Sequence, residues 1–372
     1  MPASSLGLTA FRGRQAVIQG DSALVNHLPL VGDIAAVPMA GSARTRTRPR
    51  ARLLMYGVLL ACMGIAMYLF GVLLALPRHL LGGGPHFLAV NEWIVWYSGV
   101  PLVLGFGLAL IDLFVLFGGK RTMRTEVRCD PIANKRVVVA LTAYNDEASI
   151  GPAVRDFLAH PMVDEVIVVS NNSTDRTLEF AAEAGATAIN EPRQGYGRCV
   201  YRCFQEAIKR DNELVVLCEG DLTFRAFDLD KFLAYAPHAD FVNGTRTVEG
   251  LRARVTQLST FMYYGNLFVG KLLEAKHLGR GTVTDVGTTY KLCRRDALGR
   301  LMPHLNPTVN LEFNAHFLDV ALDQDCGIVE CPITFHPRVG VSKGGNVNNL
   351  RAMKVGLRML LGIVLGWRMV EA

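Results

Sequence analysis

The hydrophobic residues of this chain form long uncharged runs in its first third and short runs separated by polar turns after residue 135. Leu53–Leu76 has 24 residues without a charge, and at about 1.5 Å per helical residue it can cross a membrane core of about 30 Å. Ile94–Phe117 is a second apolar run, which tolerates Pro101 and carries Asp112 close enough to its far end to reach the interface. Interfacial aromatic residues mark its start, namely Trp93, Trp96 and Tyr97. We predict a two-helix transmembrane hairpin over residues 53–118.

Positive charge is concentrated at the two outer ends of this hairpin and is nearly lacking in the loop that joins its two runs. Five arginines precede the first run, at positions 44, 46, 48, 50 and 52, and four basic residues follow the second, Lys120, Arg121, Arg124 and Arg128. The predicted loop between the runs, Pro77–Glu92, contains one arginine, Arg78. The positive-inside rule then places both outer flanks, and everything after Phe117, in the cytoplasm. The arginine run alone would also suit a nucleic acid; because it abuts a membrane span, we expect no nucleic-acid partner, and we treat residues 1–52 as a disordered basic tail.

From residue 135 to about 345 the pattern predicts alternating strands and helices. The expected order is strand 137–141, helix 149–160, strand 165–169, a helix ending at 184, strand 186–190, a helix ending at 209 and strand 214–219. Repeated βα units predict an α/β domain, with a mostly parallel sheet, helices on both faces and a ligand crevice at the carboxyl ends of the strands.

The strand at 214–219 ends on two carboxylates, Glu219 and Asp221, with only Gly220 between them. Hard oxygen ligands at a strand end suit Mg²⁺ or Mn²⁺ bound to a phosphate group. The alternative is an ordinary acidic loop after a buried strand.

Other strand ends carry residues suited to a nucleotide. Tyr144 offers a ring for stacking on a base, unless it only packs, and Asp146 or Asn171 offers hydrogen bonds to the edge of the base. Arg193, which is followed by Gly195, suits phosphate, because glycine allows close approach and arginine presents a planar fork. Neither a Walker-type nor a dinucleotide glycine motif follows the first strand. Phosphates would therefore depend chiefly on metal and arginine.

Composition adds two points. Hydrophobic residues make up 50% of the 372 residues, which is high for a wholly soluble protein, whereas the net charge of +6 is modest and informative only through its placement. The eight cysteines lack zinc-site spacing and suggest free thiols in a reducing compartment.

Seven short motifs occur in an order that resembles the family 2 glycosyltransferases with the GT-A fold, and most of all the polyprenyl-phosphate sugar transferases, the group of dolichyl-phosphate mannose synthase. They are LTAYNDE (141–147), VVSNNSTDRT (168–177), RQGYG (193–197), EGD (219–221), GTR (244–246), DVGTTY (285–290) and RVGVSK (338–343). The resemblance covers residues 135–345. It implies inverting transfer from a UDP- or GDP-sugar, with a divalent metal as cofactor.

The resemblance also implies residue roles on the donor side. The donor would be held by Thr142, Tyr144, Asp146, Asn171, Arg193, Gly195 and Gly220. Asp221, assisted by Glu219, would bind the metal. The chain departs from the family pattern at Thr142, at Asp146, at the Ser170-Asn171 pair and at Glu219, where the family has proline, glutamate, two acidic residues and aspartate.

On the acceptor side, the resemblance assigns catalysis to Asp221, Asp285 and Glu312, and phosphate or acceptor binding to Arg246, Arg338, Ser342 and Lys343. Asp285 could instead be a turn residue, and the basic residues a solvated loop. Glu312 would serve as a general base for a hydroxyl acceptor, whereas a phosphate acceptor is already ionised and needs none.

Two more segments bear on a lipid acceptor. Phe261–Leu278 suits an amphipathic helix with Phe261, Tyr264, Phe268 and Leu272 on one stripe. Leu350–Val370, within a C-terminal region of residues 346–372, places Arg351, Lys354 and Arg358 on one face and is too short to span, so we expect an interfacial helix. Either could equally be core.

Together these features predict a membrane-anchored enzyme that transfers a sugar to a polyprenyl phosphate. Its expected partners are a nucleotide-sugar, that lipid and the membrane, and a homo-oligomer is left open. The rivals are a glycosyltransferase acting on another lipid-linked glycan or polysaccharide, and a non-catalytic nucleotide-binding scaffold.

Overall fold

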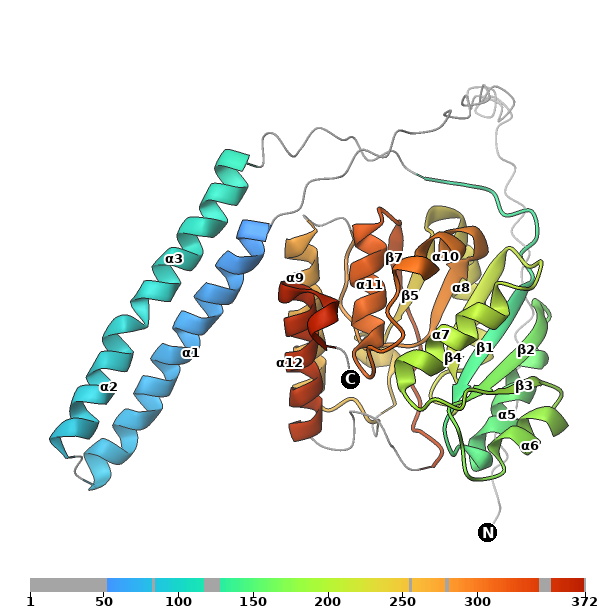
Figure 1. Cartoon of the computed structure of the whole chain (residues 1–372), viewed down its shortest axis with the longest axis horizontal. Helices are drawn as coiled ribbons and strands as arrows, with labels where there is room; N and C mark the ends of the chain where they lie inside the picture. Colours follow the sequence, from blue (N-terminus) through green and yellow to red (C-terminus); the bar gives the residue numbers. More distant parts are fainter. Residues whose placement is uncertain are drawn as a thin grey trace, which may run out of the picture. The chain divides into compact units, whose positions relative to one another are not determined.

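A seven-stranded mixed sheet forms the centre of the domain in the computed structural model, which describes residues 52–81, 84–116, 128–253, 256–277, 281–340 and 349–370 (Figure 1). Its spatial order is β3-β2-β1-β4-β6-β5-β7. The strands are β1 (Val137–Ala143), β2 (Val163–Ser170), β3 (Thr187–Asn190), β4 (Leu214–Glu219), β5 (Phe241–Thr245), β6 (Lys291–Arg294) and β7 (Ile328–Pro332). Only β6 runs antiparallel to its neighbours within this sheet. The predicted α/β class with a mostly parallel sheet is confirmed, whereas all of the predicted tail except Arg52 lies outside the described residues.

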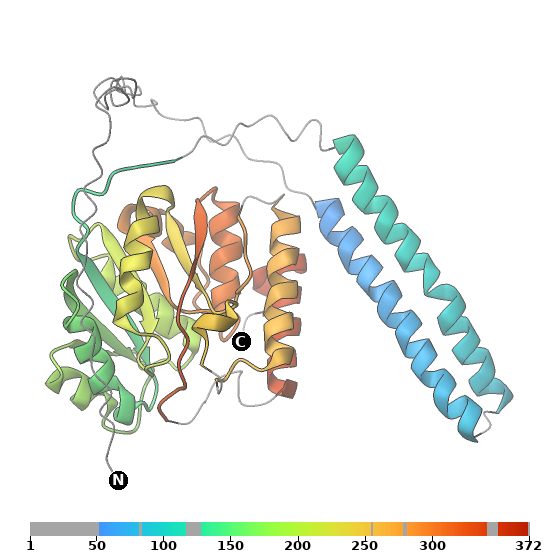
Figure 2. The same cartoon turned by 180° about the vertical axis from the view of Figure 1, so that it is seen from behind.

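Both faces of the sheet are buried because successive strand residues point to opposite sides. Val137, Val139 and Leu141 of β1 pack with α5 (Glu147–Leu158), α6 (Thr177–Glu183) and α8 (Leu229–Tyr235). The intervening Val138 and Ala140 face α7 (Tyr196–Ala207), α10 (Arg295–Leu301) and α11 (Phe313–Asp323). Figures 1 and 2 show these helices on both sides of the sheet. A strand covered twice has no polar face, which explains its unbroken apolar run.

The sheet brings distant polar segments to one edge. β1, β2 and β4 are parallel neighbours, so the turns after Ala143, Ser170 and Glu219 lie side by side. Because β6 runs the opposite way, the segment that precedes Lys291 reaches the same edge. β5 and β7 are parallel and also end there. A crevice at this edge is the expected ligand position in such a fold.

Two helices, α9 (Thr260–Lys276) and α12 (Asn349–Leu365), pack against each other beside the sheet (Figures 1 and 2). Both helices expose large apolar side chains. On α9 these are Phe261, Tyr264 and Phe268, whereas Leu272 of the predicted stripe is buried. On α12 the exposed apolar residues are Leu350, Met353, Leu357, Leu361 and Leu365.

The predicted hairpin is built from α1 (Arg52–Leu81), α2 (Pro85–Tyr97), α3 (Gly99–Leu110) and a π-helical turn at Ile111–Leu116. The segments Arg52–Leu76 and Pro85–Val115 are long and apolar enough to cross a membrane. The predicted loop at 77–92 is wrong in its extent, because α1 continues to Leu81 and α2 begins at Pro85. Backbone hydrogen bonds continue a helix beyond its apolar run, so the run alone underestimates the helix.

Small and polar residues hold the two arms of the hairpin together. A Cβ added at Gly57 would lie 2.6 Å from the Gly105 carbonyl oxygen, so only glycine allows this close approach. Asp112 is buried, and its carboxylate accepts a hydrogen bond of 2.9 Å from the backbone N–H of Leu54 in the first turn of α1. At the other end the Asn91 amide donates to the Gly71 carbonyl. The Asp112 carboxylate therefore caps the N-terminal end of α1 from the other arm of the hairpin.

Candidate active site

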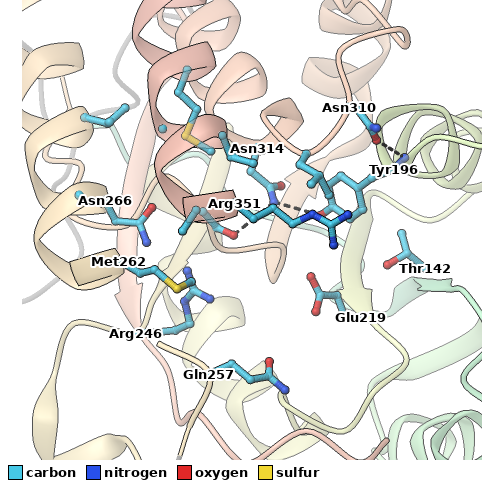
Figure 3. A pocket seen from close by; sticks show the side chains of 18 of the residues that line it. Thr142, Tyr196, Glu219, Arg246, Gln257, Met262, Asn266, Asn310, Asn314 and Arg351 are labelled. Atoms are coloured by element: carbon cyan, nitrogen blue, oxygen red, sulfur yellow. Dashed lines mark hydrogen bonds between the residues drawn. The ribbon is translucent and has the colours of Figure 1, made fainter. Parts of the chain in front are cut away.

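A pocket of about 660 Å³ opens at the polar edge of the sheet and continues between α9 and α12 (Figure 3). Its polar end contains nine of the residues predicted from sequence, namely Thr142, Tyr144, Asp146, Asn171, Gly195, Glu219, Asp221, Arg246 and Arg338. Its other end is lined by apolar residues from the two helices, including Phe261, Phe268, Val355, Leu357 and Leu360. One cavity thus joins a charged site to an apolar groove.

Asp221 is a buried carboxylate of this site, with only 1% of its surface exposed. Its Oδ1 accepts hydrogen bonds from the backbone N–H and the hydroxyl of Thr223, at 3.0 and 2.6 Å. Its buried Oδ2 has no hydrogen-bond partner among the described residues and lies 3.2 Å from Nη1 of Arg338. One oxygen is therefore oriented by the protein, while the other points toward cationic partners.

Gly220 positions this carboxylate rather than lining the pocket. A Cβ at Gly220 would lie 2.4 Å from Cδ1 of Ile150 on α5, and its backbone N–H donates to the Thr142 carbonyl oxygen at 2.9 Å. The glycine therefore allows the chain after β4 to pack closely against α5.

Arg338 joins Asp221, the predicted metal ligand, to the predicted nucleotide-binding side of the pocket. Its guanidinium pairs with Asp146 at 2.8 Å and with Asp221 at 3.2 Å. Asp146 is also held by the Tyr144 backbone N–H at 2.9 Å. A planar cation between two carboxylates offsets their repulsion and is well placed for a diphosphate.

Glu219 is held by a chain of hydroxyl groups. The Thr289 hydroxyl donates to Oε1 of Glu219 at 2.7 Å, and it lies 2.5 Å from the hydroxyl of Tyr196. Burial, together with the neighbouring Asp221 carboxylate, raises the pKa of Glu219 to about 7. Two acidic groups this close favour a shared cation.

The predicted nucleotide-binding end is shaped by the turn after β2 and the start of α7. Asn171 accepts a hydrogen bond of 3.1 Å from the backbone N–H of Gly195, which has a φ of +143°. The Gln194 amide lies 3.5 Å from the Tyr144 hydroxyl, so the tyrosine ring forms one wall. Ser170, where the family pattern has an acidic residue, is buried and hydrogen-bonds Ser173 at 2.7 Å.

Arg246 and Asp285 form a buried ion pair. Nε and Nη2 of Arg246 donate to the two Asp285 oxygens at 2.7 and 2.8 Å, and the backbone N–H groups of Arg246 and Gly287 donate to the same carboxylate. Burial would raise the pKa of Asp285, but Arg246 outweighs it and the net pKa is lowered. Asp285 therefore acts on the pocket through Arg246, which lines it.

Four predicted residues lie outside the described lining of the pocket, Arg193, Gly220, Asp285 and Glu312. Arg193 is largely exposed and pairs with Glu191 at 3.1 Å. Glu312 is buried behind α12, where Arg358 contacts it at 3.1 Å and where burial raises its pKa. Its role as a base stays a prediction. Ser342 and Lys343 lie outside the described residues.

A polar wall on the opposite side of the pocket was not predicted from the sequence. Figure 3 shows Tyr196, Asn310, Asn314 and Arg351 there. Asn310 accepts from the Tyr196 backbone N–H at 2.7 Å, and the Asn314 amide donates to the Tyr196 hydroxyl at 3.0 Å. The one signal in the sequence was Tyr196, which stands inside the RQGYG motif.

Comparison with known proteins identifies this arrangement. Residues 138–302 match the family model "Glycosyl transferase family 2". An uncharacterised glycosyltransferase of Mycobacterium tuberculosis is 34% identical over 173 residues, which are 45% of this chain and 71% of the relative. The chain belongs to glycosyl transferase family 2.

Two further family 2 relatives come from the archaeon Haloferax volcanii. A dolichyl-phosphate hexose transferase is 29% identical over 220 residues, covering 59% of this chain and 89% of the relative. The low-salt glycan biosynthesis hexosyltransferase Agl6 is 30% identical over 207 residues, covering 54% of this chain but only 48% of the relative. This chain thus matches about half the length of the latter protein.

Proposed function

We propose that this family 2 protein is an inverting glycosyltransferase that moves a sugar from a UDP- or GDP-sugar to a polyprenyl phosphate. The observation that supports this best is the single pocket, which joins buried carboxylates at the strand ends to an apolar groove between α9 and α12. A nucleotide-sugar needs the first part, and a prenyl chain needs the second. The similarity to the Haloferax dolichyl-phosphate hexose transferase supports such an acceptor.

The donor set fits a divalent cation. Asp221 presents a buried oxygen that lacks a hydrogen-bond partner among the described residues, and Glu219 stands two residues away with a raised pKa. Hard carboxylate oxygens suit Mg²⁺ or Mn²⁺. Such an ion, held by Asp221 with help from Glu219, would neutralise charge on the departing diphosphate.

The protein's own residues then have separate tasks. Tyr144 and Asn171 would hold the nucleoside, and Arg338 would contact the diphosphate in exchange for its present carboxylate partners. An acceptor phosphate oxygen attacks the anomeric carbon from the face opposite the nucleoside diphosphate, which leaves with the bonding electrons. This oxygen is already ionised near neutral pH and needs no base, which agrees with the position of Glu312 behind α12.

The membrane arrangement is part of the proposal. The two candidate spans would form a hairpin with both ends on the cytoplasmic side, following the arginine-rich flanks. The exposed apolar stripes of α9 and α12 would then contact the inner leaflet, where a prenyl chain can pass from the lipid into the groove.

The test is transfer of radiolabelled sugar from a panel of UDP- and GDP-sugars into organic-extractable lipid, using membranes that contain the full chain and added polyprenyl phosphate. Transfer should depend on a divalent cation, stop with EDTA and be lost in Asp221→Asn. Asp230→Asn is the matched control, because Asp230 is an exposed carboxylate on α8, with 80% side-chain exposure. Label in water-soluble glycan would contradict the acceptor, and nucleotide binding without turnover would favour a scaffold.

A further inference from the structure

The first turn of α12 carries an arginine that none of the seven motifs includes. Arg351 lines the pocket, and Figure 3 shows its side chain reaching from α12 across the cavity toward Tyr196 and Glu219. Sequence analysis placed this residue on the basic face of an interfacial helix. In the structure Arg351 turns into the pocket and Arg358 contacts the buried Glu312, whereas Lys354 stays exposed.

Arg351 stands where the character of the pocket changes. The carboxylates and hydroxyls of the strand ends lie on one side of it, whereas the residues that follow it along α12 and line the groove are mainly apolar, Met353, Val355, Leu357 and Leu360. α9 adds Phe261 and Phe268 on the facing wall. An amphiphile whose tail lies along these residues would place its polar head at Arg351.

The charge balance of the pocket favours the same position. Three arginines contribute to its described lining, Arg246, Arg338 and Arg351, and each has a different place in it. Arg246 is held by both oxygens of Asp285, and Arg338 bridges Asp146 and Asp221. An anionic head group that approaches Glu219 and Asp221 is repelled unless a cation offsets its charge. Arg351 supplies that cation on the acceptor side.

The protein also fixes α12 firmly enough to position this residue. In its middle, Nε of Arg358 lies 3.1 Å from Oε1 of the buried Glu312. Near its end, Nζ of Lys276 donates to the Ile363 carbonyl oxygen at 2.9 Å and to Asp319. The Trp367 indole donates to Asp319 at 2.8 Å. A cation on an anchored helix is preorganised, so less affinity is lost in ordering it.

We propose that Arg351 binds the phosphate of the lipid acceptor and so selects a prenyl phosphate over an uncharged prenol. The inference rests on the proposed function, of which it names the acceptor-recognition residue. The donor diphosphate is the other possible source of a phosphate group at this position, and the experiment separates the two.

The test measures binding of farnesyl phosphate, farnesol, UDP and GDP to the purified full chain in detergent, with Mg²⁺ present. The wild type is compared with Arg351→Gln, Arg351→Lys and Lys354→Gln. Lys354 is the matched control, since it is an exposed cation on the same helix that does not belong to the described lining of the pocket.

Arg351→Gln should weaken farnesyl phosphate binding about tenfold to a hundredfold, as expected for losing hydrogen bonds to a charged group. Farnesol and nucleotide binding should not change, Arg351→Lys should keep part of the affinity, and Lys354→Gln should behave like the wild type. In transfer assays Arg351→Gln should raise the acceptor KM and leave the donor KM unchanged.

Three results would overturn the proposal: a loss confined to UDP or GDP, which would assign Arg351 to the donor; an equal loss for farnesol, which would indicate a role in packing only; and an equal effect of Lys354→Gln, which would indicate general attraction of anions. Failure of the proposed function would look different. In that case the wild type itself would not distinguish farnesyl phosphate from farnesol.

Discussion

Replacing Asp285 by asparagine should destabilise the protein strongly, because it leaves Arg246 charged and buried. Arg246 and Asp285 expose only 6% and 1% of their surface, and four hydrogen bonds converge on the carboxylate. Removing one partner of such a pair costs about 3–5 kcal/mol. At about 2–4 °C per kcal/mol for a domain of this size, the thermal midpoint should fall by about 6–20 °C.

Thermal unfolding of the full chain in detergent measures this effect, with two comparison variants. Asp296→Asn breaks an exposed pair with Arg300 and should change the midpoint little, since surface pairs contribute about 0–1 kcal/mol. The double change Arg246→Met with Asp285→Leu should regain much of the lost stability, because it removes both buried charges.

The same experiment decides how Asp285 contributes to activity. If it acts through Arg246, Asp285→Asn loses stability and activity together. A variant that melts within about 2 °C of the wild type, well under the shift expected for a broken buried pair, yet has no activity, would refute this reasoning. It would instead support a direct catalytic role for Asp285.

Three further predictions concern other parts of the chain. Burial lowers the pKa of His316 to about 4, and its Nε2 already accepts a hydrogen bond from the Asn306 backbone N–H at 2.8 Å. The unfolded chain therefore binds a proton at His316 more tightly than the folded chain does. The free energy of unfolding should fall by up to about 3 kcal/mol as the pH drops from 6.5 to 4. His316→Gln should flatten that part of a plot of thermal midpoint against pH, and an unchanged slope would contradict the assignment. Asp112→Leu should destabilise the hairpin by about 1–2 kcal/mol through loss of the cap on α1, whereas Asp112→Asn should keep most of the stability. Protease resistance in detergent measures this difference. Equal resistance of Asp112→Leu and wild type would exclude the cap. Gly197→Ala should prevent correct packing of α7, because the added Cβ would lie 1.7 Å from the Val309 carbonyl oxygen. Soluble yield and thermal midpoint should both fall. A wild-type midpoint would show that this contact relaxes easily.

The sequence predicted the first half of the domain well because each element there is decided locally. The run at β1 is apolar over its whole length, as a strand covered on both faces must be, and polar turns separate it from α5 and β2. Tyr144, Asp146, Asn171, Glu219 and Asp221 follow parallel strands, which must end at one edge, so this regularity predicts that they meet in the pocket. Thr142, Arg246 and Arg338 were predicted from the family resemblance instead.

What the sequence did not predict depends on contacts between distant residues. Nothing in Lys291–Arg294 reveals that β6 runs antiparallel between β4 and β5. The pair of Arg246 and Asp285 spans 39 positions, and the contact of Asn314 with Tyr196 spans 118. The orientation of Arg351 was missed for a related reason. The periodicity of α12 places Arg351, Lys354 and Arg358 on one face, but only the structure shows that Arg351 enters the pocket and Arg358 contacts Glu312 while Lys354 stays exposed.

The central claim is that the sugar is transferred to a prenyl phosphate, and mass spectrometry of the lipid product tests it most directly. Purified full chain would be incubated with undecaprenyl phosphate, Mg²⁺ or Mn²⁺ and the donor selected by the panel, with Asp221→Asn in parallel. The account predicts a lipid heavier than the acceptor by one sugar residue, labile to mild acid and lacking in the Asp221→Asn reaction. Release of nucleoside diphosphate and free sugar with an unmodified lipid, or a sugar attached to any other acceptor in preference to undecaprenyl phosphate, would contradict it.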